Sequence, residues 1–290
     1  MTACITEVLL DGLCFPESLR WHEDRLWFSD FFDRGVFSVD SNGVARGEAA
    51  VVGQPSGLGW DPDGRLLVVS KLDRMILRRE ADGSLMEHAN LSGLGEGDCN
   101  DMVVDAHGRA YVGEVGFDPF AWFGAGGTFA EAPAASLFRV EPDGSTHVAA
   151  AGLRVPNGTV LLDGGRVLVV AESFGAQLSA FDVDPATGVL THRRVWAPLP
   201  GRTPDGICAD RSGGLWVADA RRPECVRVEE GGVISDTVST SQNCYACALG
   251  GSDGRTLYCA TAPATDEPSA SHARSGRIEQ LISTPPAPTA

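Results

Sequence analysis

The chain has 290 residues, of which 43% are hydrophobic and 21% charged, and its formal net charge is −16. This composition is typical of a folded globular protein, and the acidity argues against nucleic-acid binding because there is no basic patch to neutralise phosphates. No apolar run is long enough to cross a bilayer, and the N-terminal stretch lacks the basic and apolar regions of a signal peptide, so we expect a cytoplasmic protein without membrane contact.

Six similar segments follow one another along the chain. Each contains a short apolar strand, a turn and a second strand, which is the signature of a β-hairpin. A looser hairpin follows each of them. The six tight hairpins span residues 17–30, 56–70, 100–114, 157–172, 205–220 and 247–261.

Four strands that recur six times, with almost no helical periodicity, indicate an all-β fold. We expect a six-bladed β-propeller with four antiparallel strands per blade. The propeller is predicted to be a single domain over residues 1–283, followed by a disordered C-terminal tail over 284–290 that is poor in apolar residues. The N-terminal segment 5–10 is expected to pair with the last blade and close the ring.

The first strand of each propeller blade lines the central channel, so the residues that open these strands should converge at one end of it. In chain order they are Glu17, Ser56, Asn100, Asn157, Asp205 and Cys247. Acids and amides in a low-dielectric channel are costly unless a ligand shares them. Oxygen donors suit a hard divalent cation, so we expect one metal ion there, Ca²⁺ first, with Mg²⁺, Mn²⁺ or Zn²⁺ as alternatives. The alternative is that these residues only hydrogen-bond buried water.

Two long loops are expected beside that end of the channel. Residues 115–136 carry Phe117 and Trp122 among glycines, and residues 261–276 carry His272. An aromatic loop with glycine hinges suits a lid over a substrate, although it equally suits an oligomer interface. Monomer and homo-oligomer both stay open. The alternative for His272 is a solvated loop residue.

The eight cysteines are expected to be reduced and to act as small hydrophobic residues. Cys244 and Cys247 form one CxxC motif. No second pair accompanies it at zinc-finger spacing, so the sequence favours a structural interpretation of this motif.

The motifs FPESLRW, NDMVVDAHGRAYVGEVGF, VPNGTVLL and TPDGICAD occur in this order along the chain. Together they resemble the conserved blocks of the gluconolactonase/regucalcin/luciferin-regenerating-enzyme family, which is also called senescence marker protein-like. The resemblance implies a six-bladed propeller with one central divalent metal that hydrolyses lactones or related esters. It further implies that Glu17, Asn157 and Asp205 are metal ligands. Asn100 would be a fourth ligand or a substrate contact, and Asp205 the base or nucleophile.

One position departs from the family pattern. Sugar lactonases of that family carry an Arg two residues before the Asn of the second quoted motif, where this chain has Asp98. An anion in place of a cation reverses the local electrostatic preference, which argues against a sugar-acid lactone as substrate. The alternative is that Asp98 is a solvated loop residue.

These observations favour a divalent-metal-dependent hydrolase of a lactone or related cyclic ester. The metal would polarise the carbonyl group of a small-molecule substrate, and Asp205 would act as base or nucleophile. The candidate substrate-binding residues are Asn100, Asp98, Phe117, Trp122 and His272. The alternatives are a non-catalytic propeller that binds calcium or a small ligand, and a phosphotriesterase or non-hydrolytic tailoring enzyme on the same metal site.

Overall fold

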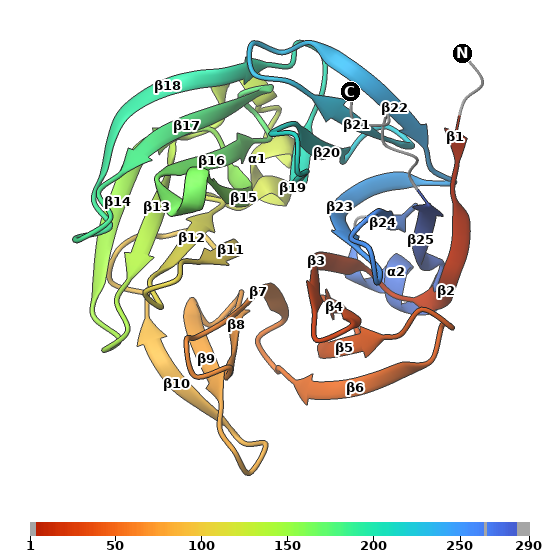
Figure 1. Cartoon of the computed structure of the whole chain (residues 1–290). Helices are drawn as coiled ribbons and strands as arrows, with labels where there is room; N and C mark the ends of the chain where they lie inside the picture. The colour runs from red at the N-terminus through yellow and green to blue at the C-terminus, as the bar shows by residue number, and fades with distance from the viewer. Residues whose placement is uncertain (1–3, 264–265, 283–290) are drawn as a thin grey trace.

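The computed structural model of the chain describes residues 4–263 and 266–282. The predicted tail, residues 284–290, lies outside the described residues. The described part forms six sheets arranged around a common axis (Figure 1), so the predicted six-bladed β-propeller is confirmed.

The first three blades each consist of four consecutive strands, paired in antiparallel order from the axis outward. Blade 1 contains β3 (Pro16–His22), β4 (Arg25–Asp30), β5 (Gly35–Val39) and β6 (Ala45–Ala50). Blade 2 contains β7 (Pro55–Trp60), β8 (Leu66–Ser70), β9 (Met75–Arg79) and β10 (Leu85–Asn90). Blade 3 contains β11 (Cys99–Val104), β12 (Ala110–Glu114), β13 (Ala135–Val140) and β14 (Thr146–Leu153).

Of the remaining three blades, blade 4 again has four consecutive strands, and blades 5 and 6 each include one N-terminal strand. Blade 4 contains β15 (Pro156–Leu162), β16 (Val167–Glu172), β17 (Gln177–Val183) and β18 (Leu190–Pro198). Blade 5 contains β19 (Pro204–Ala209), β20 (Leu215–Asp219), β21 (Glu224–Val228), β22 (Ile234–Ser239) and the short β1 (Cys4–Ile5). Blade 6 contains β23 (Asn243–Gly250), β24 (Thr256–Ala262), β25 (Gly276–Ile282) and β2 (Glu7–Leu13).

The N-terminus closes the ring, as the sequence predicted. Strand β2 pairs antiparallel with β25, with Glu7 opposite Gln280, and so supplies the outer strand of blade 6. The preceding strand β1 pairs in parallel with β22 of blade 5, with Cys4 opposite Val238. The N-terminal segment therefore ties together the last two blades of the chain.

Burial follows the position of each strand within its blade. The second strand of a blade lies between two neighbouring blades, so both of its faces are covered; every residue of β8 and of β20 is buried. In the seam between blades 4 and 5, Val169 of β16 packs in one cluster with Leu215 and Val217 of β20. Outer strands such as β6 are largely exposed. Continuous apolar runs therefore mark buried strands here rather than helices.

The Asp-rich turns close hairpins at the face opposite the candidate site. In the β7–β8 turn, the Asp61 side chain accepts hydrogen bonds from the backbone N–H groups of Asp63 and Arg65. Gly64 follows at φ +79°, a left-handed conformation that glycine adopts without strain. These acids are turn residues and differ in role from Asp205.

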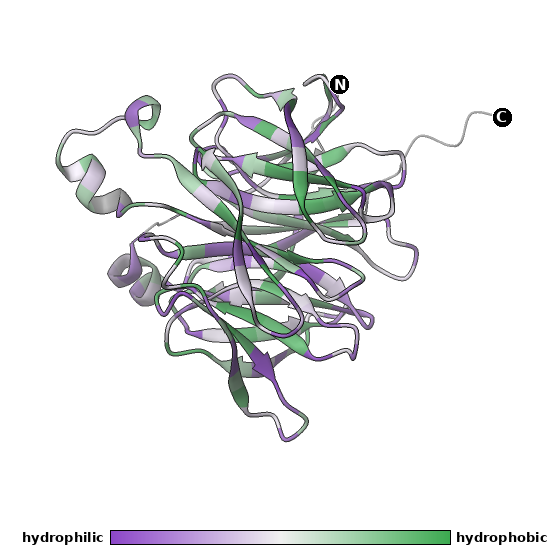
Figure 2. Ribbon diagram, turned by 90° about the vertical axis from the view of Figure 1, so that its left-hand side faces the viewer, coloured by the Kyte–Doolittle hydropathy of each residue, from purple (hydrophilic) through white to green (hydrophobic). Residues whose placement is uncertain are grey.

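Short helical segments project from one face of the propeller (Figure 2). Helix α1 (Pro119–Gly124) and the 3₁₀ turn η1 (Phe129–Glu131) lie between β12 and β13, and α2 (Glu267–Ala273) lies between β24 and β25. A second 3₁₀ turn, η2 (Asp163–Gly165), joins β15 to β16. None of the helices in the described residues is long and apolar enough to span a membrane.

Candidate active site

A bulge recurs near the start of the first strand of every blade. The pairing with the second strand shifts by one residue at this point, so two residues lie opposite one, and the chain is locally re-aimed. The shifts fall between Glu17 and Arg20, Pro55 and Leu58, Cys99 and Met102, Pro156 and Thr159, Pro204 and Ile207, and Cys244 and Ala246. This repeated irregularity places one side chain per blade at the end of the channel.

The register defines a channel ring of six residues: Glu17, Ser56, Asn100, Asn157, Asp205 and Tyr245. Five were predicted, but the sixth is Tyr245 rather than Cys247. Cys244 faces Thr261 at the end of β24, as Pro204 faces Asp219 at the end of β20. Cys247 lies two residues deeper, with its Sγ near the carbonyl oxygen of Gly206.

The error arose from the length of one hairpin. Strands β23 and β24 are each two residues longer than β19 and β20. In blade 5 the ring residue Asp205 lies ten residues before Leu215 of the second strand, but the same spacing in blade 6 leads to Cys247, which lies beyond the bulge. A local signal was available, because the dipeptide Cys244-Tyr245 occupies the same register as Cys99-Asn100.

Glycines beside the ring allow the inner strands to approach closely. A Cβ atom on Gly158 would lie 2.5 Å from the carbonyl oxygen of Asp205, and one on Gly206 would lie 2.7 Å from the Cα atom of Ala246. These distances are shorter than van der Waals contact and involve backbone atoms. The ring residues are therefore held on tightly packed strands.

Two ring carboxylates share one buried environment. Burial, and next the charge on Asp205, raise the pKa of Glu17 well above its ordinary value. Burial also raises the pKa of Asp205, and the charges on Asp101 and Asp219 add to the rise. The Oδ1 atom of Asp205 is buried and has no hydrogen-bond partner among the described residues. An acid in this state favours a bound cation or a proton.

The neighbouring acid Asp101 is in the opposite situation. Its Oδ1 accepts a hydrogen bond from the Arg20 guanidinium at 2.7 Å, from the backbone N–H of Met102 at 2.8 Å and from the Ser18 hydroxyl at 3.3 Å. Arg20 reaches it across the channel from β3. The sequence analysis did not predict this pair. The one available signal was that Asp101 directly follows the ring residue Asn100. Arg20 is therefore held in an ion pair with Asp101, although its charge also acts to lower the pKa of Glu17.

Hydrogen bonds orient the two ring amides differently. The Nδ2 of Asn157 donates to the Ser173 hydroxyl at 3.3 Å, and that hydroxyl donates to the carbonyl oxygen of Pro204 at 2.7 Å. These two hydrogen bonds fix the amide so that the side-chain oxygen of Asn157 remains available to a ligand. In Asn100 the oxygen accepts from the Ser56 hydroxyl at 3.5 Å, which favours use of its N–H groups.

Tyr245 brings a hydroxyl group to the two acids. Burial, followed by the charges on Asp205 and Glu17, raises its pKa to about 12, so the hydroxyl stays protonated at neutral pH. The hydroxyl is buried and interacts with the side chain of Asn243, which acts to lower its pKa against the effect of burial. The ring of Tyr245 packs on Phe15, with centroids 4.6 Å apart. A phenol held in this way suits donation to a substrate oxygen.

Acids at the ends of the second strands have a structural role. Asp30 accepts hydrogen bonds from the backbone N–H groups of Cys14 and Phe15, both at 2.8 Å. Glu172 accepts from the N–H of Arg154 at 2.8 Å, and Glu114 from that of Ser136 at 3.1 Å. These carboxylates hold the loops that surround the ring, so their contribution to the site is indirect.

The long loop between β12 and β13 packs across neighbouring blades. Phe117 contacts Trp122 and Phe174, with centroids 5.9 Å apart in each case, and Phe129 stacks edge-on against Phe174 at 4.5 Å. The Arg221 guanidinium lies 4.9 Å from the Phe129 ring centre. Because Phe174 belongs to blade 4 and Arg221 to blade 5, Phe117 and Trp122 belong to an aromatic layer that extends from blade 3 towards blade 5.

The two remaining predicted residues lie at the edge of the site. Asp98 forms an ion pair with Lys71, and its side chain is 39% exposed, so its charge is compensated within the loop region. His272 is exposed on α2, whose Glu267 pairs with Arg34 of blade 1 at 3.1 Å. The positions of both residues are compatible with substrate contact, but the structure gives neither a hydrogen bond to a ring residue.

Two surface cavities lie at the opposite face. One of about 450 Å³ is lined by His22, Trp27 and Trp60, among others, and one of about 510 Å³ lies beside the β19–β20 turn. Their linings contain no ring residue. We place the candidate site at the ring, because the convergence of buried acids and amides there identifies a site better than cavity size.

The sequence is similar to that of a known protein family and of individual proteins. Residues 15–263 match the family described as SMP-30/Gluconolactonase/LRE-like region. Pentonolactonase XacC of Haloferax volcanii is 25% identical over 263 residues, which cover 89% of this chain and 85% of that protein. Regucalcin of Danio rerio is 29% identical over 167 residues, which cover 56% of this chain and 54% of that protein, so the match spans about half of the relative.

Solved structures share the fold. A gluconolactonase from Xanthomonas campestris aligns with a TM-score of 0.74 at 23% identity, over 95% of this chain and 88% of that one. A calcium-binding regucalcin from Agrobacterium tumefaciens aligns with a TM-score of 0.78 at 20% identity, over 97% of this chain and 95% of that one. At these identities the likeness is evidence for the propeller fold.

Proposed function

We propose that this chain, which belongs to the SMP-30/gluconolactonase/LRE-like family, is a hydrolase that opens a lactone or a related cyclic ester of a small molecule at the channel ring. The match to a pentonolactonase over most of both chains supports lactone hydrolysis as the reaction class.

The observation that carries the proposal is the pair of buried acids Glu17 and Asp205, neither of which forms an ion pair within the described residues. Burial raises the pKa of both acids, the charge on Asp205 adds to the rise at Glu17, and the Oδ1 of Asp205 lacks a partner among the described residues. The nearby cationic side chain, Arg20, is engaged by Asp101. An all-oxygen set of two carboxylates and an amide fits a divalent ion such as Ca²⁺.

Glu17, Asn157 and Asp205 are thus the residues that would hold the ion, with Asn100 beside them. A divalent cation at this position supplies Lewis-acid polarisation of the lactone carbonyl. The Ser173 hydroxyl keeps the oxygen of Asn157 turned toward the site, and the bulged strands keep the two carboxylates in place. Preorganised donors of this kind need no rearrangement during the reaction.

The chain's own groups account for the proton transfers. The Oδ1 of Asp205 accepts a proton from a water molecule, which adds to the carbonyl carbon of the lactone. The ring C–O bond then breaks, and the proton passes from Asp205 to the leaving alkoxide oxygen. The protonated hydroxyl of Tyr245 and the N–H groups of Asn100 donate hydrogen bonds that orient the substrate.

The edge of the site selects the substrate in this proposal. Lys71 and Asp98 form a nearly neutral ion pair, so a polyhydroxy lactone meets one donor and one acceptor group there rather than an isolated anion. Phe117 and Trp122 form an apolar wall that suits the face of a sugar ring or an apolar substituent. We therefore retain sugar lactones among the substrates to be tested.

A hydrolysis screen tests the proposal. Purified protein in Ca²⁺ is assayed with pentono- and hexonolactones, an apolar lactone and a phosphotriester, then with chelator, and again after Ca²⁺ is restored. We expect lactone opening that chelation abolishes and Ca²⁺ restores, and that Asp205→Asn abolishes while Asp105→Asn retains it. Asp105 is a matched control, because it is also buried but pairs with Arg109 at the opposite face. Binding of Ca²⁺ without turnover of any substrate would instead favour a binding protein.

A further inference from the structure

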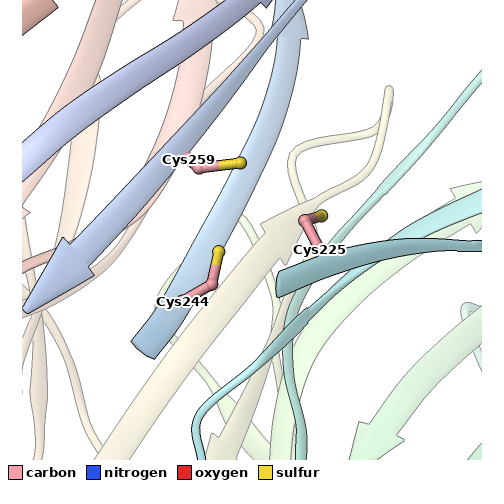
Figure 3. Close-up of side chains that lie close together, drawn as sticks. All are labelled: Cys225, Cys244 and Cys259. Atoms are coloured by element: carbon pink, nitrogen blue, oxygen red, sulfur yellow. The ribbon is translucent and has the colours of Figure 1, made fainter. Parts of the chain in front are cut away.

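A second cluster of metal-binding side chains lies between blades 5 and 6. It contains cysteines from β19, β21, β23 and β24: Cys208, Cys225, Cys244, Cys247 and Cys259. The Sγ atoms of Cys225, Cys244 and Cys259 all lie within 4.8 Å of one another. Figure 3 shows these three side chains close together, each from a different strand. They are separate in sequence from the ring acids and take no part in the proposed hydrolysis.

The bulge that places Tyr245 in the channel ring also brings the cysteines of this cluster together. Residues three apart in a regular strand point to opposite faces. The register shift between Cys244 and Ala246 inserts one residue, so Cys244 and Cys247 lie on the same face of β23. Cys247 is directly opposite Cys259 on β24. Cys225 approaches from blade 5, and its thiol interacts with those of Cys244, Cys247 and Cys259.

The surroundings are apolar. Trp216, Val238 and Leu257 pack in the same cluster, and the three cysteines are fully buried. The thiols of Cys225 and Cys244 hydrogen-bond with that of Cys259, so the three sulfur atoms face one another within this cluster.

We propose that Cys225, Cys244 and Cys259 form a second metal site, for a thiophilic d¹⁰ cation, Zn²⁺ or Cu(I). Sulfur ligands select these ions over Ca²⁺ and Mg²⁺. Tetrahedral zinc with Zn–S bonds of about 2.3 Å brings sulfur atoms to about 3.8 Å from one another. The observed spacing reaches this arrangement with small side-chain shifts, and Cys247 is adjacent as a fourth sulfur.

The position of the site gives it a structural purpose. It links β21 of blade 5 to β23 and β24 of blade 6, and the N-terminal strands β1 and β2 bridge the same two blades. The ring itself is closed next to this seam, where β2 pairs with β25 within blade 6. Metal binding adds its free energy to folding, so an ion here would hold the seam shut.

Metal binding by the full-length protein tests the proposal. The chain is dialysed under reducing conditions against Zn²⁺ or Cu(I), with excess Ca²⁺ present to fill the ring, and metal per chain and X-ray absorption are measured. We expect one thiophilic ion per chain with three or four sulfur neighbours. The two dialysis arms identify which ion is held more tightly. Retention of neither ion, or a shell of nitrogen and oxygen atoms alone, would overturn the proposal.

Matched variants exclude other binding sites. Cys259→Ala should weaken binding by more than about 100-fold, because it removes a direct ligand. Cys14→Ala is the control, because Cys14 is also buried but lies between β2 and β3, outside the cluster, and it should bind as the wild type does. Asp205→Asn should also bind normally, which separates this site from the ring. Equal retention by the Cys259 and Cys14 variants would contradict the assignment, and the wild-type spectrum decides the question if Cys259→Ala does not fold.

Discussion

The two neighbouring acids Asp205 and Asp101 should respond to the same substitution with opposite signs. In metal-free protein, Asp205→Asn removes a buried charge that has no ion-pair partner among the described residues and that repels Glu17. Burying a charged group without such compensation costs about 1–3 kcal/mol or more, so the variant should be more stable than the wild type by roughly 1–3 kcal/mol. For a domain of this size, about 2 °C per kcal/mol gives a rise in Tm of roughly 2–6 °C.

Asp101→Asn is the control. It replaces an acid that already accepts three hydrogen bonds, and it leaves the Arg20 guanidinium without its carboxylate partner. Hydrogen bonds to charged groups contribute about 1.5–3 kcal/mol, so this variant should lose about that much stability. Both substitutions convert a carboxylate into a carboxamide, so opposite changes in stability must come from the different surroundings of Asp205 and Asp101.

The assay is thermal unfolding of the wild type and both variants in chelator and again in Ca²⁺. Saturation at 100 times Kd adds about 2.7 kcal/mol to a protein that binds in its folded state, so Ca²⁺ should stabilise the wild type and leave Asp205→Asn unchanged. If Asp205→Asn destabilises the chelated protein as much as Asp101→Asn does, then Asp205 is not an uncompensated acid and the reasoning fails.

The pH dependence has a defined direction. Burial raises the pKa of Asp205, so the folded chelated protein holds a proton that the unfolded chain releases. The wild type therefore loses stability as pH rises from the ordinary carboxyl range through the raised pKa. The advantage of Asp205→Asn in chelator should be larger near about pH 8 than near about pH 5. An advantage that grows toward acid pH would be the wrong sign.

Three further changes test other parts of the account. Tyr245→Phe should lower kcat by about 10-fold or more while Ca²⁺ binding stays normal, because it removes one donor to the substrate; unchanged steady-state kinetics would exclude this role. Lys71→Met leaves Asp98 unpaired at the edge of the site, so KM for sugar lactones should rise more than KM for an apolar lactone, and equal effects would argue against contact with substrate hydroxyls. Gly206→Ala places a Cβ 2.7 Å from Cα of Ala246, so urea unfolding should show a loss of about 1–3 kcal/mol, and a neutral result would mean that the strands are not closely packed.

The sequence predicted the propeller because every blade repeats the same hairpin. Turn residues and apolar strands at a fixed spacing define the fold locally, and the closure by the N-terminus followed from counting strands. Five of the six ring positions came from the same alignment. Tyr245 was missed because a two-residue extension of one hairpin displaced the count, and only strand pairing reveals the repeated bulge.

Contacts between blades were beyond the sequence. Arg20 and Asp101 are 81 residues apart and meet across the channel, so no periodicity relates them. The same holds for the cysteines: the sequence offered the CxxC motif of Cys244 and Cys247, whereas the closest group joins Cys244 to Cys225 and Cys259 on other strands. Such groups form only when the blades pack against one another. That packing results from many weak apolar contacts, and no short sequence motif encodes it.

The central claim is that Asp205 takes part in lactone hydrolysis at a metal-bearing ring. The most direct measurement is kcat for a cleaved lactone in saturating Ca²⁺, compared between wild type and Asp205→Asn, with bound metal counted in the same samples. We predict about one Ca²⁺ per wild-type chain and turnover that falls by about 10²-fold or more in the variant. A variant that turns over the lactone as fast as the wild type, or a wild type that is fully active without metal, would contradict the account.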